Sequence, residues 1–250
     1  MSFPILNVAA YRFVPLDDAI ALRGRLLARA LEAGLKGTIL LAEEGINLYL
    51  AGPEGALRAF MAELQADTRF AGLPVKESWS ATPPFRRLRV KVKREIIRMN
   101  QPAIRPVERR APAVDAATLA RWLRAGHCDE GRPVVMLDTR NGFEVDAGAF
   151  EGALDWRLQR FSDFPAALEA HKAAFAGKTV VSYCTGGIRC EKAALVMQQA
   201  GVEHVHQLDG GILRYFEQTA GAPGWRGSCF VFDERVALDP ALQAAAGEPA

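Results

Sequence analysis

The alternation of apolar and polar positions predicts a mixed domain of strands and helices in the first hundred residues. Apolar runs with β-branched residues predict strands, and apolar residues at intervals of three and four predict amphipathic helices. The expected elements are a strand at 5–14, a helix at 19–34, two strands within 37–49, a helix at 53–64 and a long strand at 87–99. This order is typical of a ferredoxin-like α+β domain, which we assign to residues 1–99.

The second part of the chain shows a different, regularly alternating pattern. Residues 100–112 contain several prolines and little periodicity, so they are interpreted as a linker. Beyond them, strands are predicted at 133–138, 179–184 and 204–208, and helices at 113–123, 164–175 and 212–218. Strands that alternate with helices predict an α/β domain with a mostly parallel central sheet, assigned to 113–221 and followed by a C-terminal segment and tail at 222–250.

The last predicted strand of the first domain is strongly basic. Its apolar residues are Leu88, Val90 and Val92, and basic residues stand between and after them, so one face is apolar and the other positive. Residues 86–110 hold ten lysines and arginines against two glutamates, in a chain of net charge +2. Such a concentration favours nucleic-acid phosphates, with candidate contacts at Arg87, Arg89, Lys91, Lys93 and Arg94. The alternative is an edge strand whose charges prevent aggregation.

The overall composition narrows the class of protein. Half of the 250 residues are hydrophobic, yet no apolar run is long enough to span a membrane, and no basic segment followed by an apolar stretch opens the chain. We therefore expect a soluble, cytoplasmic protein that does not bind membranes. Its four cysteines are too few for a secreted disulfide scaffold, and their spacing with the histidines does not suit zinc. No metal site is predicted.

Cys184 is the candidate nucleophile. It ends a predicted strand, and ligands of open α/β sheets sit outside the carboxyl ends of the strands. The loop of Thr185, Gly186, Gly187 and Ile188 can turn its backbone amides inward, and Arg189 supplies a cation, so a thiolate would be stabilised. The alternative is a buried structural cysteine. The Cys-x4-Arg spacing is one residue shorter than a phosphatase loop, which favours a smaller group, such as a persulfide sulfur, over phosphate.

The other three cysteines have less specific surroundings. Cys190 follows the loop directly and either packs at the start of the helix or serves as a resolving thiol for an oxidised or persulfidated Cys184. Cys128 and Cys229 are interpreted as ordinary packed or surface thiols.

Two further motifs make the second domain resemble the rhodanese family, in which a strand-end cysteine carries a persulfide. Residues 137–153 are similar to the rhodanese pattern D-x-R-x-x-x-E-x-x-x-G-x-x-x-G-A, and residues 208–215, LDGGILRY, to its closing strand-turn-helix. The resemblance implies a rhodanese-like fold and supporting roles for Asp138 and Arg140. Ala149 replaces a histidine that many relatives carry.

Three separated strings narrow the resemblance across both domains. YCTGGIRCEKA at 183–193, KGTILLAEEGIN at 36–47 and CFVFDERVA at 229–237 are similar to the rhodanese-domain tRNA uridine(34) hydroxylases. The resemblance implies an oxidoreductase that uses molecular oxygen as co-substrate to convert the wobble uridine of tRNA to 5-hydroxyuridine. It also implies that Cys184 is essential and that the partner is a tRNA anticodon loop. No cofactor is identifiable, and the sequence does not determine the oligomeric state.

Two other functions stay open at this point. A rhodanese-type sulfurtransferase would carry a persulfide on Cys184, and a non-enzymatic protein would act as an RNA-binding adaptor or sulfur carrier. The route of a hydroxylation is open as well. The Cys184 thiolate can add to C6 of uracil and make C5 electron-rich, or a persulfide or peroxy-type sulfur species can act instead.

Overall fold

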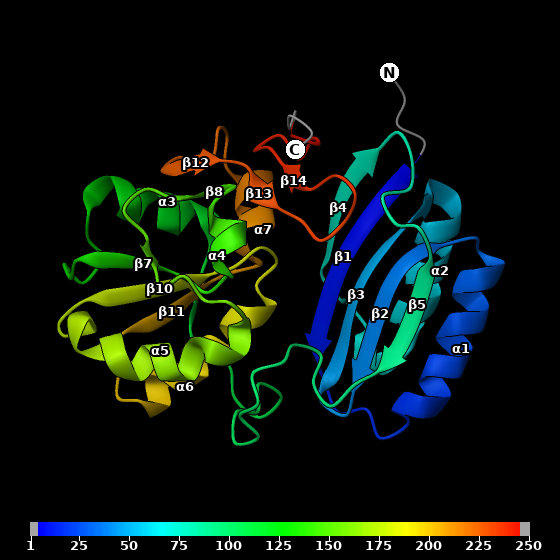
Figure 1. Cartoon of the computed structure of the whole chain (residues 1–250), viewed down its shortest axis with the longest axis horizontal. Helices are drawn as coiled ribbons and strands as arrows, with labels where there is room; N and C mark the ends of the chain where they lie inside the picture. The colour runs from blue at the N-terminus through cyan, green and yellow to red at the C-terminus, as the bar shows by residue number, and fades with distance from the viewer. Residues whose placement is uncertain (1–4, 246–250) are drawn as a thin grey trace. The chain divides into compact units, whose positions relative to one another are not determined.

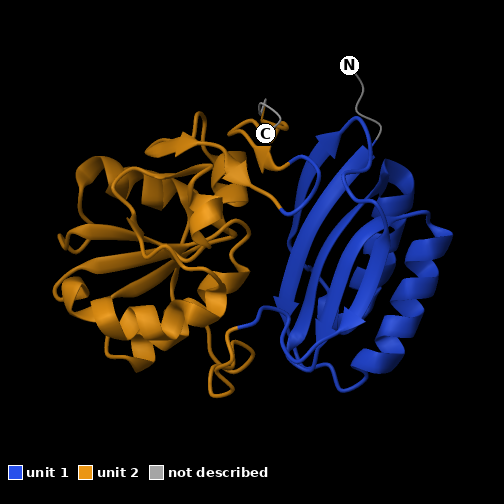
Figure 2. Ribbon diagram, in the orientation of Figure 1, with its two compact units in different colours: residues 1–98, 232–235 blue, residues 99–231, 236–250 orange. Residues whose placement is uncertain are grey.

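The computed structural model describes residues 5–245, which divide into two compact units (Figure 2). Unit 1 comprises residues 5–98 and 232–235, and unit 2 comprises residues 99–231 and 236–245. The boundaries predicted from the sequence do not include the return of 232–235 to unit 1. Residues 1–4 and 246–250, expected in the first domain and in the tail, lie outside the described residues. No helix within the described part is long and apolar enough to cross a membrane.

Unit 1 is a five-stranded sheet with two helices on one face (Figure 1). Strands β4-β1-β3-β2 have the ferredoxin-like order that the sequence predicts, and β5 adds a parallel strand beside β2. The elements are β1 (Ile5–Phe13), α1 (Ala19–Glu32), β2 (Lys36–Ala42), β3 (Gly45–Pro53), α2 (Glu54–Ala66), the 3-10 helix η1 (Thr68–Phe70), β4 (Val75–Ser80) and β5 (Leu88–Val92). Alternate residues of the strands, such as Val8 and Leu48, pack with Leu22 and Phe60 of the helices in one core.

The fourth strand of this domain is not the one that the sequence predicts. β4 at Val75–Ser80 pairs with β1 at one edge of the sheet, whereas the predicted long strand at 87–99 is the short β5 at the opposite edge. The prediction missed β4 because its sequence, VKESWS, lacks a clear apolar alternation. Its pairing with β1 uses backbone groups, which any residue other than proline supplies.

The predicted strand at 87–99 ends early for a structural reason. Beyond Val92, the Ile96 N–H donates to the Glu44 carboxylate at 2.8 Å, and the Asn47 side chain donates to the Ile96 carbonyl at 3.2 Å. These side chains satisfy the backbone of Ile96 in place of a strand partner. Val92, expected on the apolar face, is 38% exposed, whereas Val90 is 5% exposed and belongs to the core.

Unit 2 is built on the parallel sheet β6-β11-β10-β7-β9, so the predicted parallel architecture is confirmed. Its strands are β6 (Ala113–Val114), β7 (Val134–Asp138), β9 (Leu154–Asp155), β10 (Thr179–Tyr183) and β11 (Val205–Leu208). Two ribbons complete the strands, β8 (Gly148–Phe150) with β12 (Trp225–Gly227) and β13 (Cys229–Phe230) with β14 (Ala237–Leu238). Every residue of β10 is buried, as expected of a central parallel strand.

Helices cover both faces of this sheet. Figure 1 shows α3 and α7 on one face and α5 and α6 on the other. The helices are α3 (Ala116–Ala125), the one-turn α4 (Gly142–Val145), α5 (Phe164–His171), α6 (Ile188–Gln199) and α7 (Gly211–Gln218), with 3-10 turns η2 (Phe161–Asp163) and η3 (Lys172–Phe175). This covering places the carboxyl end of β10, and with it the following loop, at one edge of a rigid layer.

The proline-containing segment 100–112 has no regular secondary structure, and its end is attached to unit 2. The Pro112 carbonyl accepts from the Gln207 N–H at 2.9 Å, and the Arg110 guanidinium binds the Glu191 carboxylate at 2.9 to 3.1 Å. The end of the segment is therefore held by a backbone amide of β11 and a carboxylate of α6.

The position of β5 gives a stability prediction. Replacing Val90 by Ala removes two buried methyl groups and should lower the free energy of unfolding of unit 1 by about 2 kcal/mol. Val92→Ala, the matched control, should change it by less than about 0.5 kcal/mol because this side chain is exposed. Urea unfolding of the fluorotryptophan-labelled chain measures both, since the fluorine NMR signal of Trp79 reports on unit 1. Equal effects of the two variants would contradict this placement of β5.

Candidate active site

Cys184 lies directly after β10, at the carboxyl end of the central strand of unit 2. The loop that follows enters α6 at Ile188, so the predicted strand, loop and helix are confirmed. Gly187, the N-cap of α6, has a left-handed φ of 96°, a conformation that glycine adopts without a steric penalty. The Cys184 side chain is fully buried. The structure therefore places the sulfur inside the turn and not on the surface.

The first turn of α7 holds this loop in place. The N–H groups of Ile212 and Leu213 donate to the carbonyls of Cys184 and Thr185 at 2.9 and 3.1 Å. Gly211 has a φ of 69°, and a Cβ there would lie 2.4 Å from the Cys184 carbonyl oxygen. Only a residue without a side chain allows this approach. The motif LDGGILRY thus holds the loop that follows Cys184 through backbone hydrogen bonds, a role that the sequence pattern does not predict.

Several groups stabilise negative charge on the Cys184 sulfur. The Gly187 N–H donates to Sγ at 3.1 Å. Burial by itself raises the pKa of this thiol, but the hydrogen bond from Cys190, the charge of Arg189 and backbone N–H groups outweigh burial and lower the pKa to about 5. The lowered pKa favours the thiolate, which is the nucleophilic form of cysteine.

Arg189 is positioned by Glu144, a residue from the opposite side of the loop. The two nitrogens of its guanidinium donate to the two oxygens of the Glu144 carboxylate at 2.6 and 2.7 Å, and both side chains are buried. Burial lowers the pKa of Arg189, but Glu144 reverses the effect and holds the pKa above its ordinary value. The Glu144 carboxylate also accepts a hydrogen bond from the Asn141 N–H at 3.0 Å, as part of a capping box at the start of α4. Glu144 appears in the sequence only as a motif match, 45 residues before Arg189.

Asp138 and Arg140 support the loop and do not belong to it. Arg140 donates to both Asp138 oxygens, at 2.9 and 2.6 Å, and both side chains are fully buried. Arg140 also donates to the Glu144 carbonyl at 3.1 Å, and its guanidinium lies over the rings of Tyr183 and Trp225. The pair therefore fixes α4, and through it Glu144, against the strands β7 and β10.

The three remaining cysteines are all buried, so the surface alternative for Cys128 and Cys229 is wrong. Cys190 lies in the first turn of α6, where its N–H donates to the Gly187 carbonyl at 3.1 Å. Burial and the hydrogen bond to Cys184 raise the pKa of Cys190 well above its ordinary value. Burial also raises the pKa of Cys229, to about 12. The pKa of Cys184 is thus lowered, whereas those of Cys190 and Cys229 are raised.

The C-terminal motif CFVFDERVA also reaches the loop through its first residues. The Thr185 hydroxyl lies 3.5 Å from the Phe230 carbonyl in β13, and the Phe230 ring meets the Phe143 ring of α4 edge to face, 5.2 Å between centroids. Pairing of β13 with β14 holds the other end of the motif in unit 2, although 232–235 belong to unit 1.

The predicted nucleic-acid contacts lie in unit 1, along and beyond the edge strand β5. The side chains of all five are exposed to solvent: Arg87, Arg89, Lys91, Lys93 and Arg94. Their placement at an edge is compatible with both interpretations, a phosphate-binding surface and a protected sheet edge.

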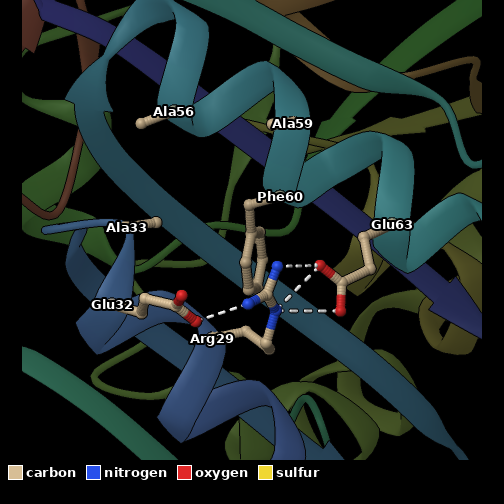
Figure 3. A pocket seen from close by; sticks show the side chains of 7 residues that line it. All are labelled: Arg29, Glu32, Ala33, Ala56, Ala59, Phe60 and Glu63. Atoms are coloured by element: carbon tan, nitrogen blue, oxygen red, sulfur yellow. Dashed lines mark hydrogen bonds and ion pairs between the residues drawn. The ribbon is translucent and has the colours of Figure 1, made fainter.

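A cavity of about 260 Å³ lies between α1 and α2 of unit 1 (Figure 3). Its one cation, Arg29, pairs with Glu63 at 2.8 Å and also with Glu32, so the lining carries one net negative charge. The ring of Phe60 forms the wall behind the guanidinium. This cavity holds no nucleophile. Within residues 5–245, no group of three or more histidine, cysteine or acidic side chains is arranged to hold a metal ion.

The charge state of Cys184 gives a second prediction. Ultraviolet absorbance of the thiolate should disappear on acidification with a midpoint near pH 5, and this step should be absent in Cys184→Ser. Arg189→Gln removes the cation and should move the midpoint upward. A wild-type midpoint near the ordinary pKa of 9.0 would refute the assignment. Because folding lowers this pKa, the thiolate stabilises the fold fully above pH 9.0, and that contribution is lost as the pH falls through 5.

Family models match both units. Residues 5–96 match the UPF0176 acylphosphatase-like domain, and residues 117–218 match the rhodanese-like domain. Among solved structures, the human single-domain sulfurtransferase is 22% identical with a TM-score of 0.36, covering 44% of this chain and 99% of that one.

Curated relatives match nearly the whole chain. The protein named tRNA uridine(34) hydroxylase in Bordetella petrii is 66% identical over 95% of this chain and 94% of its own length. The proteins of the same name in Variovorax paradoxus and Delftia acidovorans are 63% and 65% identical, over 98% and 94% of this chain and 92% and 89% of their own lengths. Identity of this extent over both units confirms the resemblance seen in the motifs. The chain belongs to the tRNA uridine(34) hydroxylase family.

Proposed function

We propose that this protein hydroxylates uridine 34 of tRNA to 5-hydroxyuridine, with molecular oxygen as co-substrate and Cys184 as the nucleophile. The relatives that match the whole chain carry the name of this activity. The observation that carries the assignment of the nucleophile is the buried Cys184 sulfur, held ionised by Gly187, Cys190 and Arg189. A thiolate of low pKa at the end of a central strand is suited to covalent catalysis.

The chemistry of uracil indicates what this thiolate does. Addition of Cys184 to C6 makes C5 electron-rich, so that C5 can take an oxygen atom, and release of the sulfur restores the ring. The Gly187 N–H and the charge of Arg189 stabilise the departing thiolate. Glu144 keeps Arg189 in place during both steps because its bidentate contact leaves the guanidinium little freedom.

The tRNA itself is held, in this proposal, by the exposed cations of unit 1. Arg89 and Lys91 stand on β5, and Lys93 follows it, all three exposed to solvent. Contacts of this kind bind the phosphate backbone and position the RNA without reading its sequence. The bases of an anticodon loop are unpaired, so the target uridine can be turned out toward a catalytic cysteine.

A sulfurtransferase is the second candidate, and the same loop favours it. The donors around Cys184 would stabilise the terminal sulfur of a persulfide as they stabilise a thiolate, and residues 117–218 match the rhodanese-like domain. Mass spectrometry of the Cys184 peptide separates the two candidates. One extra sulfur that is transferred to an acceptor, without any 5-hydroxyuridine formed, would support the sulfurtransferase.

The hydroxylase function predicts that replacing the Cys184 sulfur by oxygen abolishes activity. In a strain without its own 5-hydroxyuridine pathways, this chain should restore the nucleoside, and Cys184→Ser should reduce it to background because a serine hydroxyl stays neutral. Cys128→Ser is the matched control, since Cys128 contacts Thr179 at the other end of β10. Liquid chromatography and mass spectrometry of tRNA nucleosides give the readout. Full activity of Cys184→Ser would exclude the nucleophile.

The proposed RNA surface is tested by charge removal. Replacing Arg89, Lys91 and Lys93 together by Ala should weaken tRNA binding and lower the salt dependence of the binding constant by about one unit of slope per lost phosphate contact. The control replaces three exposed arginines of unit 2, Arg121, Arg124 and Arg160, and removes the same charge. Filter binding at a series of salt concentrations measures both. Equal effects of the two triple variants would return β5 to the role of a protected edge.

A further inference from the structure

Two buried thiols share the interior of the active loop. Cys184 directly follows β10, and Cys190 lies in the first turn of α6. The Thr139 hydroxyl links the two positions, because it contacts Cys190 Sγ at 3.7 Å and the carbonyl of Tyr183, the residue before Cys184, at 2.9 Å. Gly187 binds both residues, since its N–H donates to Cys184 Sγ and its carbonyl accepts from the Cys190 N–H, each at 3.1 Å. Neither sulfur is in a disulfide. The loop therefore brings two reduced sulfurs together in one closed turn.

The protonation of Cys190 follows from the neighbouring Thr139 hydroxyl. The Thr139 hydroxyl donates its proton to the Tyr183 carbonyl at 2.9 Å, so in its 3.7 Å contact with Cys190 Sγ it acts as acceptor. Cys190 thus keeps its own proton, and burial and the nearby negative charge of Cys184 raise its pKa well above the ordinary value. The pair consists of one thiolate and one thiol.

The proposed hydroxylation needs two electrons that uridine does not supply. Molecular oxygen delivers one atom to C5, and the other atom becomes water only if two electrons and two protons are added. Two thiols that become a disulfide release two electrons and two protons. We propose that the Cys184–Cys190 pair is the internal reductant of the reaction: uridine, oxygen and two thiols give 5-hydroxyuridine, water and a Cys184–Cys190 disulfide. This inference rests on the proposed function.

The individual steps balance. Cys184 adds to C6 of uracil, C5 forms a bond to oxygen, and departure of Cys184 with transfer of the C5 proton to the outer oxygen leaves a 5-hydroperoxide. The Cys184 thiolate then attacks that outer oxygen, so the O–O bond breaks, the sulfur becomes a sulfenic acid and the nucleoside leaves as its 5-oxyanion. The Cys190 thiol displaces water from the sulfenic sulfur and forms the disulfide. The oxyanion takes up the proton that Cys184 lost on ionising.

This assignment has a consequence for turnover. After each reaction the disulfide must be reduced by a dithiol, through thiol–disulfide exchange, before Cys184 can act again. The reaction class that must supply this enzyme is therefore a dithiol reductase. Cys128 contacts Glu130 and Thr179, and Cys229 contacts the Phe230 carbonyl, so in this proposal neither takes part in the exchange.

A single-turnover experiment tests the proposal. The full-length protein is reduced, freed of reductant without air and mixed with oxygen and tRNA from a strain that lacks 5-hydroxyuridine. Nucleoside analysis and differential alkylation with peptide mass spectrometry then count the products. We expect 5-hydroxyuridine and Cys184–Cys190 disulfide in equal amounts, no more product than protein, and renewed turnover when dithiothreitol is added.

Cysteine variants test the same stoichiometry of product and disulfide. Cys190→Ser should form no disulfide and should accumulate a sulfenic acid at Cys184, which dimedone captures only when oxygen and tRNA are both present. Cys128→Ser should behave like the wild type. Many turnovers of the wild type without reductant, with both cysteines still open to alkylation after unfolding, would overturn the inference and leave the hydroxylase function intact. Absence of 5-hydroxyuridine even with dithiothreitol would instead refute the proposed function.

Discussion

A negatively charged sulfur in the protein interior requires hydrogen bonds and a nearby cation in place of the water that it loses. Many contacts in unit 2 hold the groups that supply them. At Cys184 the donors are the Gly187 N–H and the Cys190 thiol, and the cation is Arg189. The cation is itself buried and would be unstable alone. Its carboxylate partner, Glu144, is therefore as much a part of the site as the loop.

The supports of this pair extend away from the sulfur in two directions. Glu144 is fixed by the capping box of α4, and α4 is fixed by Arg140, which the buried Asp138 and two aromatic rings hold. On the other side, the first turn of α7 donates two hydrogen bonds to the loop, and Gly211 makes room for that contact. Most residues of the family motifs thus support the loop from outside, and their contacts position the groups that lower the pKa of Cys184.

The two units divide the proposed work. Unit 2 holds a buried cysteine whose pKa is lowered, and unit 1 carries exposed cations along β5. Chemistry on a uracil ring benefits from a water-poor site, because electrostatic interactions are stronger there. Binding of a tRNA backbone benefits from exposed, solvated charge. These demands conflict within one surface, which is a physical reason for a chain with two units.

The sequence by itself determined the local features of this protein. Apolar periodicity located most of the helices and strands, the alternation of strands and helices predicted the parallel sheet, and the Cys-x4-Arg loop identified Cys184 and Arg189. These patterns can be recognised in the sequence because each depends on residues close together in the chain. The sequence did not predict strand β4, because its pairing rests on backbone groups. It did not predict the early end of β5, because that end depends on Glu44 and Asn47.

Tertiary structure alone decided the contacts that make the loop reactive. Glu144 stands 45 residues before Arg189, and Gly211 lies 27 residues after Cys184, so no local pattern links either one to the sulfur. The same holds for Thr139, which follows β7 and whose hydroxyl lies 3.7 Å from the sulfur of Cys190 in α6. Hydrogen bonds and ion pairs depend on distances of a few ångströms and on burial, and only packing of the whole unit sets both.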